Sequence, residues 1–370
     1  MKKKILFLIP NLAHGGAERV LVNLANNLDS QKYDVTVQTL FDVGVNRQYL
    51  QPQVRYIPGW KKMFRGNSYV QLLFTPHFLY RRLIRESYDI VIAYLEGSTS
   101  RIVSGCNNPD IKTVAWIHTG MIRPSLASRC FRSLKEAQKC YSRINQMVMV
   151  SSDVQKQFSK QFPGIETCVL YNTNETGQII QKAALPVTDA CFNKESFTVC
   201  TVGKLISLKG FDRLLTVHKR LLDEGLHHTV YILGIGEEEE KLRQKIREYG
   251  VEDSFILLGF RDNPYQYVSR CDLYVCSSRR EGFSTAVTEA LIVGTPVVST
   301  DCSGARELLG ENNEYGIVVE NSETGIYEGM KKMLSEPETL ANYRRMAGER
   351  GKYFSKEKTV QAVEEMLDNL

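Results

Sequence analysis

One stretch organises the rest of the chain: Leu273-Tyr-Val-Cys-Ser-Ser-Arg-Arg-Glu281-Gly-Phe-Ser-Thr-Ala-Val-Thr-Glu289-Ala-Leu-Ile-Val-Gly294-Thr-Pro296-Val-Val-Ser-Thr300. Its first four residues are typical of a buried strand, and an apolar helix follows that ends at Gly294 before a second strand begins at Pro296. This is one parallel crossover unit, and ligands of such sheets bind where strand C-termini meet helix N-termini. Glu281 is therefore expected at that edge, and Glu289 on the helix that leaves it.

Length and composition predict a two-domain globular protein. At 370 residues the chain is long for one core, and its 43% hydrophobic and 24% charged residues are ordinary for globular proteins. The start, 1–10, imitates a signal peptide, but its apolar run is too short for one and is predicted to be a strand. The nine cysteines form no CxxC pair, which favours reduced, buried thiols in a cytoplasmic protein.

Strands and helices alternate in two series. Apolar runs predict strands at 5–9, 35–40, 90–95, 113–117 and 147–151, and then at 197–202, 230–233, 254–258, 273–276, 296–300 and 316–319. The polar segment 176–196 is predicted to be the linker. The expected architecture is α/β, with doubly wound domains at 1–180 and 196–354 that face each other across a cleft. A terminal amphipathic helix at about 355–370 is expected to pack back on the first domain.

Charge is distributed unevenly along the chain. Residues 1–185 carry a net charge of +12 and the remainder −7. Within the first half, 60–65 is basic and partly aromatic, and 123–143 has a spacing that predicts one cationic helical face. A solvated face is the ordinary interpretation of either run, and binding to a membrane surface or to a phosphate-rich partner is an equally weighted alternative for the two together. No nucleic-acid motif is present. The candidate membrane or acceptor surface consists of Lys61, Lys62, Arg65, Arg129, Arg132, Lys135 and Lys139.

Several polar elements at predicted strand ends suit a ligand that carries hydroxyls and phosphates. Glu281 and Glu289 can each accept hydrogen bonds from the vicinal hydroxyls of a sugar or ribose. Lys204 and Lys209 can clamp a diphosphate. The N–H groups that start the helix suit an anionic oxygen; they belong to Phe283, Ser284 and Thr285.

Two features of the first half add to this set. Gly15-Gly16 precedes a predicted helix, where a bare turn is the commoner role and phosphate binding the alternative. His118 ends a predicted strand; a structural role is the more common one, and acceptor contact is the alternative. No Asp-x-Asp and no cluster with metal-ligand spacing occurs, so no obligatory metal or other cofactor is expected.

These residues resemble glycosyltransferase family 4, the retaining nucleotide-sugar transferases of GT-B fold. The resemblance covers essentially the whole chain, and its most specific part is Glu281-x7-Glu289 together with the segment 271–284 around Glu281. The other matching segments are Gly15-Gly-Ala-Glu-Arg19, Val202-Gly203-Lys-Leu205 with Lys209-Gly210, Leu258-Gly-Phe260 and Gly294-Thr-Pro-Val-Val298.

The resemblance implies a role for each matching residue. In the family, the counterparts of Lys204 and Lys209 bind the donor diphosphate, that of Glu281 contacts the donor sugar, and that of Glu289 binds the ribose. Backbone near Phe260 and Arg261 would hold the base, and His118 is similar to the family's histidine near the reacting sugar. The family usually has arginine at position 204, and a glycine-containing turn where this chain has 283–285.

The reaction thus expected is transfer of a hexosyl or N-acetylhexosaminyl unit from a nucleoside diphosphate sugar, with uridine preferred, to a hydroxyl with retention. No carboxylate nucleophile is apparent in the first half, which favours front-face attack assisted by the leaving phosphate. The basic first domain suggests a polyprenyl-pyrophosphate-linked glycan acceptor at the inner membrane face, as in surface polysaccharide assembly. The alternatives are a GT-B sugar-nucleotide epimerase and a non-catalytic sugar-nucleotide-binding protein.

Overall fold

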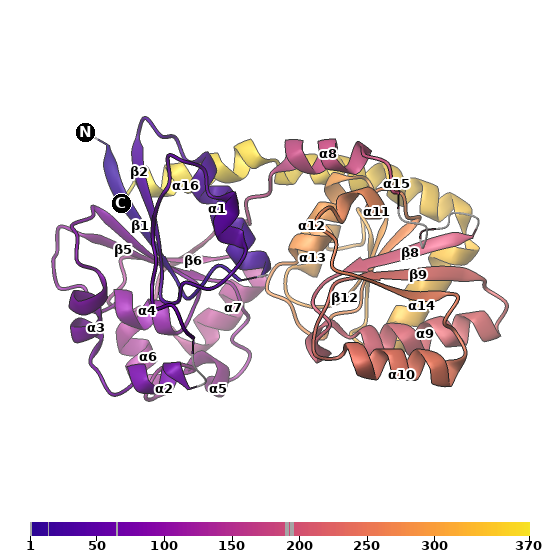
Figure 1. The fold of residues 1–370 in the computed structure, drawn as a ribbon, viewed down its shortest axis with the longest axis horizontal. Helices are drawn as coiled ribbons and strands as arrows, with labels where there is room; N and C mark the ends of the chain where they lie inside the picture. Colours follow the sequence, from indigo (N-terminus) through magenta and orange to yellow (C-terminus); the bar gives the residue numbers. More distant parts are fainter. Residues whose placement is uncertain (1, 14, 64–65, 189–191, 193–195) are drawn as a thin grey trace. The chain divides into compact units, whose positions relative to one another are not determined.

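The chain forms two compact units in the computed structural model, which describes residues 2–13, 15–63, 66–188, 192 and 196–370. The first unit consists of Met1–Asn174 together with Lys356–Leu370, and the second of Glu175–Ser355. Each unit is an α/β layer structure with its own sheet (Figure 1).

The sheet of the first unit has seven strands in the order β3-β2-β1-β4-β5-β6-β7, and all neighbours are parallel. Its central strands are buried on both faces, as parallel sheets covered by helices require. The strands are β1 (Lys3–Ile9), β2 (Tyr33–Thr39), β3 (Arg55–Ile57), β4 (Ile90–Tyr94), β5 (Lys112–Ile117), β6 (Gln146–Met149) and β7 (Thr167–Val169).

Eight α-helices and one 3-10 helix belong to this unit within its described residues. They are α1 (Gly16–Asn27), η1 (Asn46–Tyr49), α2 (Asn67–Gln71), α3 (Pro76–Leu83), α4 (Ser98–Val103), α5 (Pro124–Ala127), α6 (Leu134–Tyr141), α7 (Ser152–Gln161) and α16 (Lys356–Asp368). The C-terminal helix α16 contacts β2, where the Tyr33 hydroxyl donates to Asp368 Oδ1 at 2.6 Å. Val363 and Leu367 of α16 are fully buried.

The sheet of the second unit has six parallel strands in the order β10-β9-β8-β11-β12-β13. They are β8 (Phe197–Val202), β9 (His228–Leu233), β10 (Phe255–Gly259), β11 (Leu273–Cys276), β12 (Val297–Thr300) and β13 (Ile317–Val319). The accompanying helices are α8 (Thr176–Ala184), η2 (Ser207–Lys209), α9 (Phe211–Asp223), α10 (Glu239–Tyr249), α11 (Tyr265–Val268), α12 (Thr285–Ile292), α13 (Ala305–Leu309), α14 (Glu323–Ser335), α15 (Pro337–Gly351) and η3 (Lys352–Phe354).

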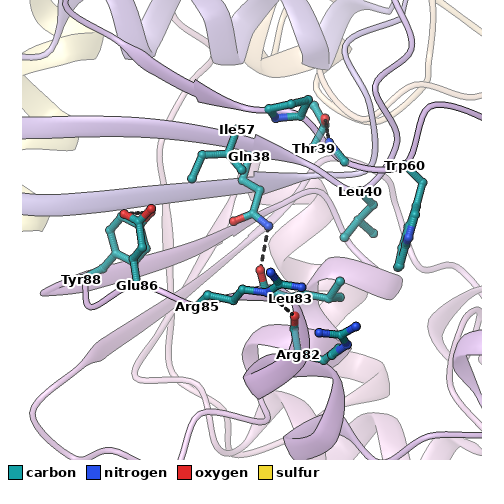
Figure 2. Close-up of a pocket in the computed structure, with 12 residues that line it drawn as sticks. Gln38, Thr39, Leu40, Ile57, Trp60, Arg82, Leu83, Arg85, Glu86 and Tyr88 are labelled. Carbon is teal, nitrogen blue, oxygen red and sulfur yellow. Dashed lines mark hydrogen bonds between the residues drawn. The ribbon is translucent and has the colours of Figure 1, made fainter.

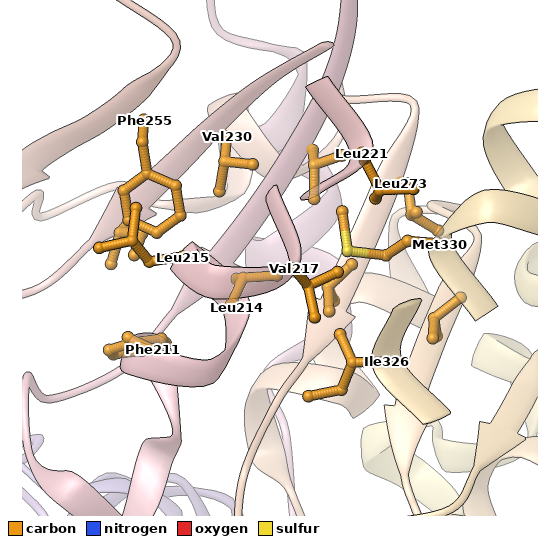
Figure 3. Packing of buried hydrophobic residues seen from close by; sticks show 14 of the residues in the cluster. Phe211, Leu214, Leu215, Val217, Leu221, Val230, Phe255, Leu273, Ile326 and Met330 are labelled. Atoms are coloured by element: carbon orange, nitrogen blue, oxygen red, sulfur yellow. The ribbon is translucent and has the colours of Figure 1, made fainter. Parts of the chain in front are cut away.

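The core of the second unit lies between its sheet and helices α9 and α14 (Figure 3). Leu214, Leu221 and Ile326 are fully buried there, and each contributes about 1.5–3 kcal/mol relative to an exposed side chain. Val217 and Leu221 are four residues apart, which places both on the inner face of α9. The regularly spaced apolar residues that predicted this helix are therefore the residues that cover the strands.

The predicted fold class is confirmed, because both sheets are parallel and share the doubly wound 3-2-1-4-5-6 strand order. The predicted linker 176–196 is wrong in its first half. Residues Thr176–Ala184 form α8, whose Ile179 and Ala183 are buried. Asn263 Nδ2 donates to the Lys182 carbonyl at 2.9 Å, so this helix is packed into the second unit. Residues 189–191 and 193–195 lie outside the described part.

Candidate functional site

The strand order of the second sheet reverses between β8 and β11, and such a switch point is where doubly wound sheets bind ligands. Lys209 lies in the loop after β8, and Glu281 in the loop after β11. Lys209 Nζ and Glu281 Oε1 are 2.6 Å apart, and the Ser278 hydroxyl donates to the same oxygen at 2.6 Å. Two predicted site residues 72 positions apart are thus in direct contact.

Lys209 is held as an ammonium ion. Burial alone would lower the pKa of Lys209, but the charge of Glu281 and its hydrogen bond outweigh this effect and raise the pKa above its usual value. The Glu281 side chain is only 13% exposed, and that of Lys209 is 26% exposed. The ammonium and carboxylate groups are therefore held in place, and solvent still reaches the pair through the more exposed lysine.

Close packing of the two loops positions this pair. Gly210, which follows Lys209, has φ +66°, and a Cβ there would lie 2.1 Å from the Ser277 carbonyl oxygen. Arg213 donates to the same carbonyl at 2.6 Å, and the Ser277 hydroxyl donates to the Lys209 carbonyl at 2.9 Å. These bonds hold the lysine before any ligand arrives, as a preorganised site requires.

Gly203 and Lys204 lie in the same loop, and the structure places them differently. A Cβ on Gly203 would be 3.4 Å from Lys209 Cε, so this glycine borders the lysine side chain. The Lys204 side chain is exposed and forms no ion pair with the residues that the structure describes. The structure therefore brings together Gly203, Lys209 and Glu281, while the Lys204 side chain is exposed in the same loop.

Glu289 lies on α12, and the Tyr265 hydroxyl donates to its Oε1 at 3.3 Å. Tyr265 starts α11, directly after the loop that contains Phe260 and Arg261. The predicted base-holding loop and the predicted ribose carboxylate are thus linked through a tyrosine that sequence reasoning missed. Its signal was weak: one aromatic residue after Pro264 in a loop that leaves a strand.

The residues at the start of α12 have distinct positions. The Phe283 side chain is buried and packs edge-on against Phe354, with ring centroids 5.7 Å apart. Ser284 is the N-cap, and its hydroxyl accepts from the Val287 N–H at 3.4 Å. Backbone N–H groups of this turn, together with the partly exposed Thr285, remain the groups that suit an anionic oxygen.

In the first unit, His118 follows β5, and its Nε2 is enclosed without a hydrogen-bond partner among the residues that the structure describes. The imidazole packs against the Tyr94 ring at a centroid distance of 4.7 Å. Burial lowers the pKa of His118 to about 3. The imidazole is therefore neutral at physiological pH, with one enclosed nitrogen able to donate to or accept from a hydroxyl.

Glu96 is a candidate that sequence reasoning missed. It follows β4, at the switch point of the first sheet, and its Oε2 accepts the His118 backbone N–H at 2.9 Å. The preceding Leu95 has φ +110°, a conformation that costs about 1–3 kcal/mol and that clusters at functional sites. The available signal was its position, since a carboxylate and a glycine directly follow a predicted strand.

Gly15 and Gly16 have an explanation within the chain. A Cβ on Gly15 would lie 1.8 Å from a Glu18 carboxylate oxygen, so this acidic side chain folds over the start of α1. Gly16 is the first residue of that helix. The tight turn is therefore a sufficient reason for the glycine pair, and the phosphate role remains a prediction. His14 lies outside the described residues.

The predicted cationic helix over 123–143 is wrong. Cys130 has φ +70°, and Ser133 caps a new helix, so α5 and α6 are separate. Only Lys135 and Lys139 share a helix, α6, while Arg129 and Arg132 lie in the segment between the two helices. Lys61 and Lys62 are exposed, and Arg65 lies outside the described residues.

Two family models match successive parts of the chain: "Glycosyltransferase Family 4" matches residues 14–175, and "Glycosyl transferases group 1" matches residues 189–352. The chain belongs to glycosyltransferase family 4. Among its relatives in this family is a Campylobacter jejuni protein, N-acetylgalactosamine-N,N'-diacetylbacillosaminyl-diphospho-undecaprenol 4-alpha-N-acetylgalactosaminyltransferase. The two are 27% identical, over 96% of this chain and 97% of that protein. The amylovoran biosynthesis glycosyltransferase AmsD of Erwinia amylovora is 24% identical over 91% of each chain.

Solved structures agree with the GT-B fold of the family 4 glycosyltransferases. Anabaena HepE in complex with UDP-glucose superposes with a TM-score of 0.77 at 20% identity, over the full length of both chains. The sucrose-phosphate synthase of Thermosynechococcus elongatus superposes with a TM-score of 0.80 at 15% identity, over 100% of this chain and 99% of that one. At these identities the likeness concerns the fold.

Proposed function

We propose that this glycosyltransferase transfers a hexosyl or N-acetylhexosaminyl unit from a UDP-sugar to a hydroxyl of a lipid-linked glycan, with retention. The contact of Lys209 with Glu281 at the β8/β11 switch point is the main observation in support, because it joins a phosphate-binding cation to a hydroxyl-binding carboxylate. Membership in a family of retaining nucleotide-sugar transferases agrees with this chemistry.

The proposed donor site uses the second unit throughout. Lys209, with Lys204 from the same loop, binds the diphosphate, and Glu281 binds sugar hydroxyls. Glu289, braced by Tyr265, binds the ribose, and backbone at Phe260 and Arg261 contacts the base. In the first unit, His118 is assigned to hydroxyl recognition, because its Nε2 is enclosed and no described residue forms a hydrogen bond with it.

In this scheme lysines and backbone N–H groups stabilise the charge that develops on the leaving diphosphate. Transfer should therefore proceed without a metal ion. In the described residues, no three His, Cys, Asp or Glu side chains gather as a metal site would need. The expected result is full transfer rate after dialysis against EDTA, measured with and without added Mg²⁺ or Mn²⁺. A rate that falls on chelation and returns with either ion would contradict this part of the proposal.

For the retention step we propose front-face attack, with the leaving phosphate accepting the acceptor's proton. Glu96 provides the sharpest test, because it is the carboxylate at the switch point of the first sheet. Glu96→Gln keeps the shape of the side chain, and its effect on transfer should be smaller than that of Lys209→Ala. A glycosyl adduct on Glu96, trapped with a slow donor and found by peptide mass spectrometry, would replace front-face attack by double displacement.

The acceptor proposal rests on the relatives and on the charge of the first unit. The Campylobacter jejuni relative is named for a diphospho-undecaprenol-linked acceptor, and AmsD for amylovoran biosynthesis. We therefore place the reaction in surface polysaccharide, capsule or glycoconjugate assembly at the inner face of the cell membrane. No helix in the described residues is long and apolar enough to cross a membrane.

The deciding experiment has two stages. A thermal-shift panel of UDP-, GDP- and ADP-sugars identifies the donor, since a ligand at about 100 times its Kd stabilises the fold by roughly 2.7 kcal/mol. The selected donor is then incubated with polyprenyl-pyrophosphate glycans, and the products are analysed by mass spectrometry. A sugar nucleotide converted without acceptor would instead indicate an epimerase. Donor binding with neither transfer nor hydrolysis would indicate a non-catalytic binding protein.

A further inference from the structure

Large apolar side chains are exposed on one short segment of the first unit, at α2 and the start of α3. Leu73 is 77% exposed, Tyr69 75% and Phe78 50%. Scattered single apolar residues are normal on protein surfaces, but a group of them is not. We call this group the apolar anchor; its members are Tyr69, Val70, Leu73, Phe74 and Phe78.

The anchor is continuous along the segment. Tyr69 and Leu73 are four residues apart on a helical turn, as are Val70 and Phe74, so each pair lies on one side of that turn. Phe74 and Phe78 then stack across the break between α2 and α3, with ring centroids 5.1 Å apart and planes inclined by 15°. The apolar surface therefore extends from one helix to the next.

The backbone beneath the anchor is held from inside the unit. The buried guanidinium of Arg101 donates to the Phe74 carbonyl at 2.8 Å and pairs with Glu136 at 2.9 Å. Arg132 donates to the Leu72 carbonyl at 2.7 Å and to the Phe74 carbonyl at 3.2 Å. These bonds fix the main chain of residues 72–74, so the exposed side chains are displayed on a supported turn. They also show that Arg132, predicted to face a membrane, serves an internal role.

The stretch of chain that contains the anchor carries charge of one sign, and Glu86, which lines the neighbouring pocket, is paired with Arg55. Residues 43–85 contain eight Lys or Arg and no Asp or Glu. In α3, Arg81 and Arg82 follow Phe78 by three and four residues and are exposed. Arg82 and the half-exposed Trp60 line one pocket, so the loop that contains Lys61 and Lys62 lies beside α3 (Figure 2). We call Lys61, Lys62, Arg81 and Arg82 the basic rim.

We propose that the apolar anchor and basic rim form the site by which the first unit docks on an anionic lipid bilayer, with Leu73, Tyr69 and Phe78 entering the headgroup–acyl boundary. Exposed aromatic and aliphatic side chains beside cations match such an interface in both polarity and charge. The purpose of docking, access to a lipid-linked acceptor, rests on the proposed function; the binding itself does not.

The test is co-sedimentation of the full chain with phosphatidylcholine vesicles that contain no or about one-third phosphatidylglycerol. Wild-type protein should bind the anionic vesicles, and less in high salt. The double substitution Leu73→Ser with Phe78→Ser should lower the partition coefficient about tenfold or more. Arg81→Gln with Arg82→Gln should lower it about fivefold for each charge removed, on anionic vesicles only.

Matched controls separate this site from general stickiness. Ile180 and Ile235, in the second unit, are 56% and 52% exposed, so Ile180→Ser with Ile235→Ser removes equivalent apolar surface elsewhere. Lys241→Gln with Arg247→Gln removes two exposed charges of α10. Both controls should bind as wild type, and unchanged melting temperatures should show that every variant is folded.

Three outcomes would overturn the proposal: no wild-type binding, anchor and rim variants that bind as well as wild type, or controls that weaken binding equally. A concentration-dependent dimer that Leu73→Ser with Phe78→Ser abolishes would assign the anchor to a second copy instead. Transfer to a detergent-solubilised acceptor should be unchanged in the anchor variant. Vesicle binding without transfer from any donor would refute the proposed function and leave this inference standing.

Discussion

Among single residues, Lys209 and Glu281 are held by direct contact with each other and with the neighbouring serines. Glu281 has a second partner in Ser278, whereas no other ion pair of Lys209 occurs within the described residues. The carboxylate therefore keeps its position when the lysine is removed, but the charge available to a diphosphate is lost. This asymmetry makes the lysine the more informative substitution.

We predict that Lys209→Ala lowers kcat/KM for the donor about 10²–10³-fold, as loss of one group that stabilises developing charge does. Initial transfer rates at varied donor concentration provide the measurement. Lys219→Ala is the control, because Lys219 pairs with Asp223 on the exposed side of α9. A Lys209→Ala enzyme within threefold of wild type would remove this lysine from the leaving-group site.

A buried histidine pair makes the second unit sensitive to acid. His218 Nδ1 lies 2.9 Å from His228 Nε2, and His218 Nε2 lies 2.9 Å from the Ser254 hydroxyl. Burial, with a smaller effect of His228, lowers the pKa of His218 to about 3 from an unfolded value of 6.5. Burial also lowers the pKa of His228. At a pH between about 3 and 6.5, His218 therefore binds a proton in the unfolded chain but not in the folded one.

Acidification from pH 6.5 toward 3 should therefore reduce the free energy of unfolding by up to about 1.4 kcal/mol per pH unit for His218. No such contribution is expected above pH 7, where both states are neutral at this residue. Urea unfolding followed by far-UV circular dichroism at pH 7 and pH 5 measures the change. His218→Gln should make the pH dependence less steep, leaving the contributions of His118 and of the buried His228, and the exposed His227→Gln should leave it unchanged.

At the scale of elements, the site depends on how closely the β8–α9 loop approaches the end of β11. Gly210 permits this approach, because it combines φ +66° with a position where a Cβ would overlap the Ser277 carbonyl oxygen. Gly225, at the other end of α9, has φ +81° but would meet nothing within 4 Å. A substitution at Gly225 therefore introduces backbone strain alone, whereas a substitution at Gly210 introduces both backbone strain and steric overlap.

Gly225→Ala should cost about 1–2 kcal/mol, the cost of the left-handed conformation alone. Gly210→Ala should cost about 1–3 kcal/mol more, because the loop must also shift. It should weaken donor binding as well, since Lys209 is its neighbour. Chemical unfolding and donor titration by calorimetry measure the two effects. Equal losses of stability in both variants, with donor affinity intact, would contradict the prediction.

For the molecule as a whole, a long-range feature of the fold is that the C-terminal helix packs on the N-terminal unit. The described C-terminal helix α16 belongs to the first unit, and the Asp29 N–H donates to Glu364 Oε1 at 2.7 Å. Leu367 is fully buried. Residues more than 330 positions apart therefore stabilise one core.

Leu367→Ala should destabilise the first unit by about 2–5 kcal/mol, the usual range for a leucine truncated in a core. Both tryptophans, Trp60 and Trp116, lie in this unit, so the midpoint of fluorescence-detected urea unfolding reports the effect. Gln361→Ala, on the exposed side of α16, should leave the midpoint unchanged. An unshifted midpoint for Leu367→Ala would show that α16 does not contribute to the core.

The amino-acid sequence was sufficient to predict two α/β domains with parallel sheets and the resemblance to the family. Apolar runs, helical periods and glycine positions are local patterns, and each reports the element that contains it. The stretch 273–300 predicted a strand, a helix and a second strand, and β11, α12 and β12 are those elements. The resemblance to the family rested on the spacing of Glu281 and Glu289 and on several short segments elsewhere in the chain, which are also local patterns.

Which side chains come into contact became clear from the folded chain alone. The contact of Lys209 with Glu281, the brace of Tyr265 on Glu289, and the place of Glu96 beside His118 all depend on strand order. Strand order is set by packing between distant segments, which no local pattern records. Two errors have related reasons: α8 buries Ile179 and Ala183 against other elements of the second unit, and Cys130 interrupts a helix that the spacing of the charges had suggested.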